Sequence, residues 1–532
     1  MPRSSQNTKN LARKLGAFLI DRDVRAGRRL LEHYFVPGAV LDPADAESYN
    51  LLLILAQWVD LGFRDIDFFE SQLAPFEAVS ASRLTVSQFL PYKLAESYRL
   101  LARIEHAQAI GLLQSLIYLH RDLLTPAQNF VAHFWLGRAL RQAGSFGQAY
   151  DEIKAARRQA ESMGADKLQA VTKIHESWLV FHRGDKRSAF ELLDEAEQTL
   201  IPIGHSLSLA NIAAARGRFI RSTGDYQRAL GFFEQAIRIY TDDYPNHPNL
   251  ARSLVNAAYV KRLIALDLQS TYNEKATAAV HARKLNVAAE AMELLRAAGQ
   301  IYARHQHQGG TGSVLINLGH LKLESGEIES ASEESEAAFA LSQQKSDKAL
   351  MARACILRSY IQMARSEEQL DDLSTPLSSA HKALRFAEDA VTLAESTQNH
   401  RLLAGAYITH GLALTAQTEV DWELARHRAG QASELLRNQD RDHLFRELRR
   451  LHSRIAQPAT VEGTLRRWMS GELGEKSFQE VEEEFAQIVI PRVWVKLGRN
   501  ISRVAQRLNV SPKKVRRALL NAHGSEAKKS VR

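Results

Sequence analysis

The sequence predicts an all-α protein: a solenoid of stacked helical hairpins followed by a small C-terminal helical domain. Its 532 residues include only 28 glycines and 13 prolines, and 45% of them are hydrophobic, a composition typical of a folded chain dominated by helices. From about residue 90, a pattern of small, apolar and turn residues recurs every forty residues. Near the end, residues 500–521 combine two short apolar helix faces with a turn between them.

The N-terminal part, residues 1–88, is predicted to be a helical cap or a set of degenerate repeats. Its helices are separated by breaks at Pro37, Pro43, Gly62 and Pro75. The longest uninterrupted apolar run of the chain, Leu51 to Ala56, lies here and is far too short to span a membrane. We therefore expect no membrane among the partners.

Residues 89–456 are predicted to form the solenoid. In four successive units, one position is always alanine and a position twelve residues before it is always small. The alanines are Ala109, Ala149, Ala189 and Ala229, and the small residues are Ser97, Gly137, Ser177 and Gly217. Small residues allow two antiparallel helices to cross closely, and each hairpin completes its core only by stacking on the next.

Two segments of this region, LGRALRQAGSFGQAY and GRFIRSTGDYQRALGFFEQAI, resemble the tetratricopeptide repeat. The period of forty residues exceeds the usual length of about 34, which implies longer helices. Similar arrays occur in the sensor regions of some large bacterial transcription regulators. After Pro245 the segment HPNLARSLVNAAYVKRL resembles repeats of the kinesin-light-chain type, but its second helix is delayed, so either a longer helix or a protruding loop is expected.

The first helices of the units carry a regular row of guanidinium and aromatic groups. In the tetratricopeptide fold this face lines the inner groove, so the resemblance implies a ligand site there. Its predicted residues are Tyr98, Arg138, Arg141, Trp178, Arg218 and Arg221. Such groups suit a peptide with carboxylates or a phosphorylated ligand, through bidentate hydrogen bonds and stacking. The alternative is that Trp178 and Phe181 are packed and the arginines are merely solvated.

Residues 457–476 contain Pro458, Gly463, Gly471 and Gly474 and are the predicted linker. Beyond it, Val504, Ala505 and Leu508 form the apolar face of one short helix, and Asn509 can close this helix in a left-handed conformation. Ser511 caps a second helix. This pattern, with four cations pointing outward from the second helix, is that of a helix-turn-helix. The alternative is a basic helix that is merely solvated.

The segment from Phe478 to Leu520, with VEEEFAQIVI, GRNISRVAQRL and NVSPKKVRRAL, resembles the Fis-type DNA-binding domain that closes many bacterial sigma-54-dependent activators. It differs in having Asn509 for the turn glycine and Pro491 in the first helix, which should kink or split that helix. Residues 477–524 are therefore the expected DNA-binding domain, followed by a basic disordered tail, 525–532. The expected contacts are Arg499, Arg503, Ser511, Lys513, Lys514, Arg516, Arg517 and Asn521. A homodimer is expected because one such unit reads only a half-site.

The charge distribution agrees with a DNA-binding end. The net charge is +8, and residues 491–532 contain twelve Lys or Arg and one acid, or +11, which leaves 8 − 11 = −3 for the first 490 residues. Such a separation favours a polyanion-binding end on a near-neutral scaffold. The single cysteine, Cys355, excludes an internal disulfide, so we expect a cytoplasmic protein associated with the nucleoid.

No motif points to catalysis, a metal or another cofactor, and the protein is expected not to be an enzyme. His305 and His307 lack a partner at metal-ligand spacing, and Gly309 to Gly312 lacks the lysine of a phosphate-binding loop. The expected function is that of a bacterial DNA-binding transcriptional regulator whose solenoid docks or senses a protein, peptide or phosphorylated ligand. The alternative is a non-enzymatic adaptor, or a regulatory subunit of a nucleic-acid-directed complex such as one in phage defence.

Overall fold

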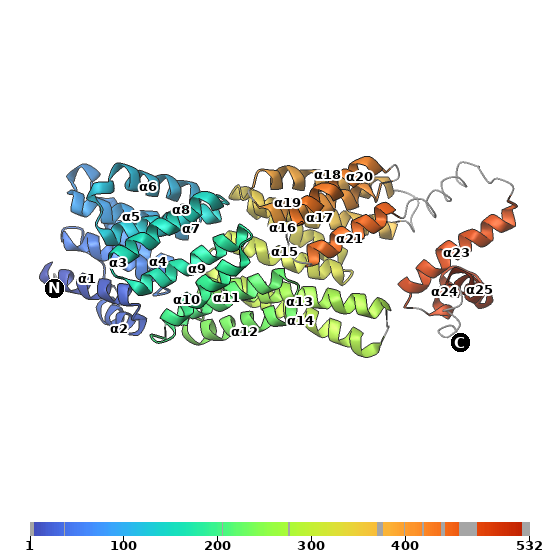
Figure 1. Ribbon diagram of the computed structural model, residues 1–532, viewed down its shortest axis with the longest axis horizontal. Coiled ribbons are helices and arrows are strands. Elements are labelled where there is room, and N and C mark those ends of the chain that lie inside the picture. Colours follow the sequence, from blue (N-terminus) through green and yellow to red (C-terminus); the bar gives the residue numbers. More distant parts are fainter. Residues whose placement is uncertain are drawn as a thin grey trace.

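The computed structural model describes residues 5–36, 38–204, 206–274, 277–369, 376–397, 399–417, 420–437, 442–456, 476–498 and 500–523. These residues form 24 α-helices, two short 3-10 helices and no strand, which confirms the all-α fold class (Figure 1). The predicted linker and the C-terminal tail lie almost wholly outside the described residues. Among the described helices, none combines the length and the apolar character needed to cross a membrane.

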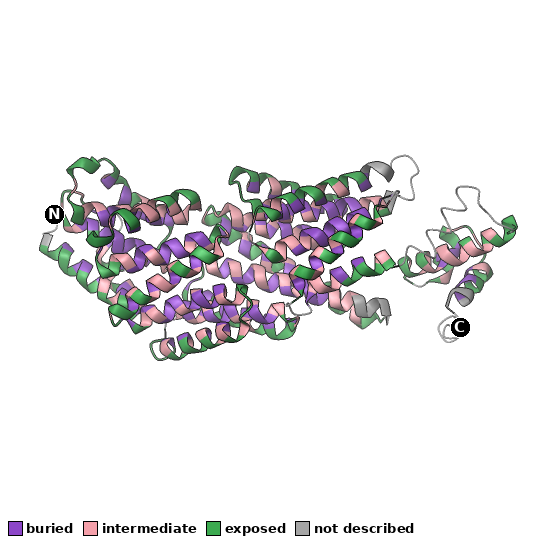
Figure 2. Cartoon of the chain, turned by 45° about the horizontal axis from the view of Figure 1, so that its top comes forward, coloured by how far each residue is buried: buried purple, intermediate pink, exposed green. Residues whose placement is uncertain are grey.

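The helices of the solenoid follow one another as antiparallel pairs. Their bounds are α1 Ser5–Asp21, α2 Val24–Tyr34, α3 Glu47–Asp60, α4 Ile66–Glu77, α5 Val86–Ala102, α6 His106–Leu119, α7 Pro126–Gln142, α8 Phe146–Ser162, α9 Asp166–His182, α10 Lys186–Leu200, α11 Ser206–Ser222, α12 Tyr226–Asp243, α13 Pro248–Glu274, α14 Ala278–Arg304, α15 Gln308–Glu324, α16 Ile328–Gln344, α17 Lys348–Gln369, α18 Pro376–Glu395, α19 His400–Leu414, α20 Trp422–Leu436 and α21 His443–Ala456. The 3-10 helices are Ala81–Arg83 and Arg121–Leu123. Figure 2 shows the buried residues concentrated where helices face one another.

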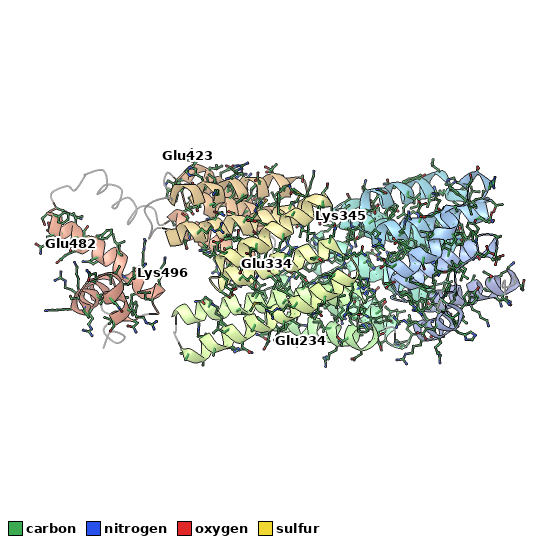
Figure 3. All side chains as sticks on the ribbon, turned by 180° about the vertical axis from the view of Figure 1, so that it is seen from behind. Glu234, Glu334, Lys345, Glu423, Glu482 and Lys496 are labelled. Carbon is green, nitrogen blue, oxygen red and sulfur yellow. The ribbon has the colours of Figure 1, made fainter. Side chains whose placement is uncertain are left out.

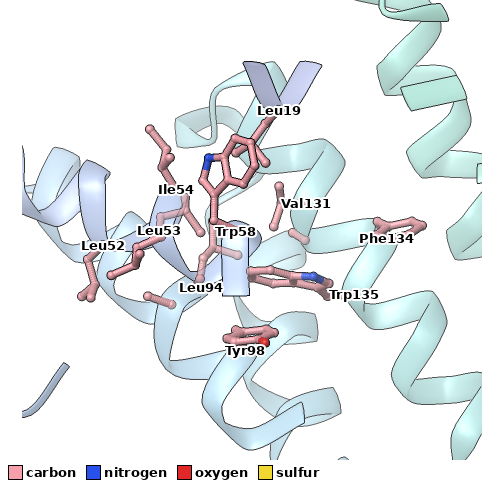
Figure 4. Close-up of a cluster of buried hydrophobic side chains, with 14 of the residues drawn as sticks. Leu19, Leu52, Leu53, Ile54, Trp58, Leu94, Tyr98, Val131, Phe134 and Trp135 are labelled. Atoms are coloured by element: carbon pink, nitrogen blue, oxygen red, sulfur yellow. The ribbon is translucent and has the colours of Figure 1, made fainter. Parts of the chain in front are cut away.

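The N-terminal helices share one hydrophobic core with the first hairpins. Trp58 of α3 is fully buried, and it packs in a cluster with Leu19 of α1, Leu94 of α5 and Val131 of α7 (Figure 4). Helix α2 crosses close to Trp58, because a Cβ atom on Gly27 would lie 1.9 Å from the indole ring. These helices therefore extend the stack and close its first end.

The forty-residue register corresponds to close helix crossings, as the sequence predicts. Ala109, Ala149, Ala189 and Ala229 are all fully buried. A Cβ atom on Gly137 would lie 2.8 Å from Ile153, and one on Gly217 would lie 2.9 Å from Phe233. Hydrogen at these positions is what lets the two helices of a hairpin approach each other.

The hairpin of α13 and α14 contains longer helices and not the protruding loop that the sequence left as an alternative. Both helices are 27 residues long, whereas α7, α9 and α11 have 17 residues each. In the two preceding units the chain turns at Gly184 and Gly224, which adopt φ angles of +92° and +86°. The corresponding residue forty positions later is Ile264, which is buried inside α13. With no residue suited to a left-handed turn, the helix continues.

The array winds until segments far apart in sequence meet. Arg103, at the end of α5, donates a hydrogen bond to the Gln306 side chain at 3.2 Å, and Arg28 of α2 donates one to the Asp243 carbonyl at 3.3 Å. Arg446 of α21 donates to the Tyr226 hydroxyl of α12 at 3.2 Å. These contacts join the N-terminal helices and α21 to the middle of the chain, so the first helices of the hairpins surround an interior space.

Three further helices follow at the C-terminal end: α23 Phe478–Lys496, α24 Ile501–Arg507 and α25 Pro512–His523. Their shared core consists of Ile490, Val504, Ala505, Val515, Ala518 and Leu519. Asn509 has the predicted left-handed conformation, with φ +49°, and the Ser511 hydroxyl accepts a hydrogen bond from the Lys514 amide at 3.2 Å. The expected split at Pro491 does not occur, because α23 continues through this residue as one helix. Ile490, the residue before this proline, is buried in the core with side chains of α24 and α25, and these contacts stabilise the helix despite the hydrogen bond that the proline removes.

Candidate ligand cavity and basic helix

The interior space of the solenoid contains a cavity of about 600 Å³. Its wall is formed mainly by the first helices of successive hairpins, α5, α7, α9, α11 and α13, together with α3. A second cavity of about 370 Å³ shares Arg141, Trp178, Arg218 and Arg252 with it and continues to α19. All six residues of the predicted groove lie on these walls: Tyr98, Arg138, Arg141, Trp178 and Arg218 on the larger cavity, and Arg221 on the smaller one.

Two of these six residues, Tyr98 and Arg138, have side chains that are held by neighbouring groups of the protein. Arg138 forms an ion pair with Asp60 of α3, in which one guanidinium nitrogen donates to Oδ1 at 3.0 Å. Burial opposes ionisation of Asp60, but the adjacent Arg138 outweighs it and holds the pKa of the carboxyl below its usual value. The Tyr98 ring is buried between Phe69 and Trp135, with ring centroids 5.4 Å from each. Tyr98 and Arg138 therefore shape the wall more than they offer free groups.

Arg141 and Arg218 differ from Arg138 because no carboxylate in the described part of the chain is paired with them. The Nε atoms of both are buried and have no hydrogen-bond partner among the described residues. The Arg141 guanidinium lies over the Trp178 ring, 5.1 Å from its centroid. Burial, followed by the neighbouring Arg252 and Arg221, lowers the pKa of Arg218 to about 9. Burial and the charges of Arg252 and Arg218 likewise lower the pKa of Arg141 well below its usual value.

The smaller cavity is lined by five arginines and, within the described part of the chain, by no carboxylate. These arginines are Arg141, Arg218, Arg221, Arg252 and Arg401. Arg221 donates to the Asn256 side chain at 2.8 Å and lies over the Tyr259 ring, 5.0 Å from its centroid. Arg401 is paired with Asp442, which stands just before α21. Several guanidinium groups around one cavity repel each other, so an anion that entered would relieve this repulsion and receive their hydrogen bonds.

Sequence reasoning missed Arg252 and Arg401. Arg252 left a signal, because it stands forty residues after Ile212 and eighty after Thr172, both fully buried. A charge at a position that is apolar or small in the earlier units indicates a change of surroundings. Arg401 left no such signal, since the loops before α19 have shifted the register.

The histidines near the cavity are explained by local structure. The His307 ring accepts a hydrogen bond from the Gly310 amide at 2.8 Å and so caps α15. Burial lowers the pKa of His307 to about 4 and that of His247 to about 4. Across the described residues, no group of three or more His, Cys, Asp or Glu side chains is arranged to hold a metal ion.

The basic face of α25 carries both paired and free cations. The Lys514 ammonium donates to Glu482 of α23 at 2.6 Å, and Arg517 is paired with Glu483 of the same helix. Lys513 and Arg516 are exposed, as is Arg503 of α24, and none of the three has an ion-pair partner among the described residues. Arg499 and the side chain of Asn521, two further expected DNA contacts, lie outside the described residues.

Neither a protein-family model nor a curated protein matches this sequence. Among solved structures, the chain is similar to a monomeric mutant of IFIT1 with Gppp-AAAA, at 11% identity and a TM-score of 0.47, over 86% of this chain and 91% of that one. It is also similar to a Rap protein complexed with Competence and Sporulation Factor, at 13% identity and a TM-score of 0.46, over 77% and 99%. The quorum sensor NprR from B. thuringiensis matches at 12% identity and a TM-score of 0.47, over 73% and 99%. At these values the similarity concerns helical-repeat architecture and supports no conclusion about ligands.

Proposed function

We propose that this protein is a DNA-binding regulator whose solenoid binds a ligand carrying carboxylate or phosphate groups. The observation that carries the ligand part is the pair Arg141 and Arg218, two half-buried arginines on a shared cavity wall whose buried Nε atoms have no partner and which have no paired carboxylate among the described residues. A buried charge without a partner is costly, and an oxyanion is the natural group to offset that cost. The sensing surface of the proposed regulator is thus the inside of the solenoid.

The ligand proposal is tested by calorimetry of the full chain with inorganic pyrophosphate and with a triglutamate peptide. We expect at least one of them to bind, and binding to be lost in Arg141→Gln and Arg218→Gln. Arg228→Gln is the matched control, because Arg228 is an exposed arginine of α12 that lines neither cavity. Binding that persists in both cavity variants would overturn the assignment of the site.

DNA binding is proposed for the exposed cations around α25. Lys513, Arg516 and Arg503 are free to meet phosphates, and a helix packed by Val515 and Leu519 presents its opposite face outward. Replacing Arg516 by glutamine should lower the salt slope of DNA binding by about 0.9 if it contacts a phosphate, or cost about 1–3 kcal/mol if it contacts a base. Unchanged affinity and slope in a salt titration would exclude Arg516 as a contact.

The homodimer belongs to the same proposal. Helix α23 exposes Phe478 and Phe485, two turns apart on one side, with exposed fractions of 78% and 48%. Exposed aromatic residues at this spacing favour a face that a second copy covers. Sedimentation of Phe485→Ser and the parent chain tests this, and a parent that remains monomeric at high concentration would contradict it.

One observation favours the adaptor as a second candidate. Because Lys514 and Arg517 are paired with Glu482 and Glu483, two of the four cations of α25 are neutralised within the unit. An adaptor that used this end for protein docking would retain no DNA even at low ionic strength, whereas the regulator would retain it.

A further inference from the structure

Arg401 contributes both to the wall of the smaller cavity and to the attachment of helix α21. Its side chain lines the smaller cavity beside Arg141 and Arg218, and it is paired with Asp442. Asp442 is 6% exposed and also holds the start of α21: its Oδ1 accepts a hydrogen bond from the Leu444 amide at 3.1 Å, and its carbonyl accepts one from the Arg446 amide at 3.3 Å. The wall of the ligand cavity is thus linked to the first turn of α21 through one ion pair.

Helix α21 is held to the solenoid by two kinds of contact. Near its centre and towards its end, Leu448 and Leu451 are buried, and Leu451 packs against Gly411 of α19. At its beginning, Arg446 is paired with Asp267 of α13 and donates to the Tyr226 hydroxyl. None of these residues lines a cavity, so the contact of this helix with the cavity wall is the pair between Asp442, just before its first turn, and Arg401.

We propose that an oxyanion in the smaller cavity competes with Asp442 for Arg401 and releases the first turn of α21. The proposal rests on the ligand site proposed above and adds its regulation. The Asp442 carboxylate and a ligand carboxylate or phosphate offer Arg401 the same charge-assisted hydrogen bonds. The ligand has the additional attraction of Arg141, Arg218, Arg221 and Arg252, which Asp442 does not neutralise. Helix α21 is the last solenoid helix in the described part of the chain, so the change would occur at the C-terminal end of the solenoid.

The Asp442→Asn variant separates the charge from the helix cap. Asparagine caps helices as well as aspartate does, so the hydrogen bond to the Leu444 amide is retained while the competitor for Arg401 is removed. The matched control is Glu423→Gln, which removes an exposed carboxylate from the first turn of α20, on the outer edge of the solenoid (Figure 3).

The experiment measures hydrogen exchange in residues 443–449 and calorimetric affinity, in the full chain, with pyrophosphate and with triglutamate as probes. We expect the bound probe to raise exchange in the first turn of α21, and Asp442→Asn to raise it without a probe. We also expect Asp442→Asn to bind the probe about 5-fold or more tightly than the parent, the lower range of ordinary coupling between sites. Glu423→Gln should match the parent in both measurements.

The outcomes separate the two proposals. If a probe binds to the parent and its binding is lost in Arg218→Gln, but Asp442→Asn changes neither affinity nor exchange, the proposed competition for Arg401 is wrong and the ligand site stands. If neither probe binds to the parent, the ligand site is overturned and the proposed competition with it. Binding of pyrophosphate alone assigns the site to phosphate groups, and binding of triglutamate alone assigns it to carboxylates.

Discussion

At the scale of single residues, Ala229 shows what the repeat register requires. It is fully buried in α12, and the facing helix α11 approaches through Gly217. We expect Ala229→Leu to lower the free energy of unfolding by about 1–3 kcal/mol, because the larger side chain overpacks this crossing. Urea unfolding checks the value. Ala282→Leu, at an exposed position of α14, should stay within about 0.5 kcal/mol of the parent, and equal stability of both variants would mean that the register is misread.

Buried histidines give the protein an acid-sensitive stability. Burial, together with the charge of Arg428, lowers the pKa of His410, which is only 3% exposed, to about 4, and burial also lowers the pKa of the half-buried His247 to about 4. The unfolded chain, with histidine pKa values of about 6.5, binds more protons than the folded chain between these limits. The contribution of these histidines to the free energy of unfolding should therefore be fully present above pH 6.5. It should be lost as the pH falls towards 4, by up to about 1.4 kcal/mol per histidine and pH unit.

Urea unfolding at pH 7.0, 5.5 and 4.5 measures this dependence. His410→Asn should flatten the curve, since one of the groups that must bind a proton on unfolding is removed. His33→Asn, at an exposed position of α2, should leave the slope unchanged. A parent whose stability is constant from pH 7 to pH 4.5 would contradict burial of these rings as neutral groups.

At the scale of elements, helices α23 and α25 carry opposite charges on the faces that meet. Their pairs Lys514–Glu482 and Arg517–Glu483 are exposed to solvent, which screens the charges, so each contributes little to stability. Their larger effect concerns any DNA that approaches, because the two carboxylates repel phosphates and occupy the cations. Glu482→Gln with Glu483→Gln should therefore tighten DNA binding and steepen its salt dependence.

Fluorescence anisotropy of labelled duplex DNA over a range of salt concentrations measures both quantities. Glu484→Gln is the control, because Glu484 is paired with Lys476 and not with α25. The idea is wrong if the double variant and the control bind DNA equally at every salt concentration.

The elements were largely predictable because their signals are local. A forty-residue spacing of alanine and glycine placed the hairpins, and Asn509 with Ser511 placed the boundary between α24 and α25. What the pattern could not supply are the partners. Arg138 finds Asp60 78 residues away, and Arg401 finds Asp442 41 residues away, and neither carboxylate shares a repeat position with its arginine. The sequence thus indicated four of the arginines that face inward, but not Arg252 or Arg401, and not which of them are neutralised.

At the scale of the whole molecule, the path of the array decides what the cavity contains. Segments about 200 residues apart meet where Arg103 contacts Gln306, so the cavities are enclosed mainly by the first half of the chain and reached by α19 through Arg401. This closure follows from small rotations accumulated from one hairpin to the next. Such rotations depend on the packing of every hairpin, so a repeat pattern alone does not predict where the winding brings distant units together.

If the solenoid senses its ligand on behalf of the C-terminal helices, as proposed, binding at the two ends should be coupled. If an anionic ligand changes DNA affinity by some factor, DNA must change ligand affinity by the same factor, typically about 5–150-fold. We expect this reciprocity for pyrophosphate or triglutamate, whichever binds, and a duplex recovered by crosslinking the protein to chromosomal DNA.

Calorimetry of the ligand with and without saturating duplex gives one factor, and anisotropy of the duplex with and without saturating ligand gives the other. Arg218→Gln should abolish both factors while leaving DNA affinity in the absence of ligand unchanged. Ligand binding that is lost in Arg218→Gln but indifferent to DNA in the parent would make the solenoid a docking platform and not a sensor.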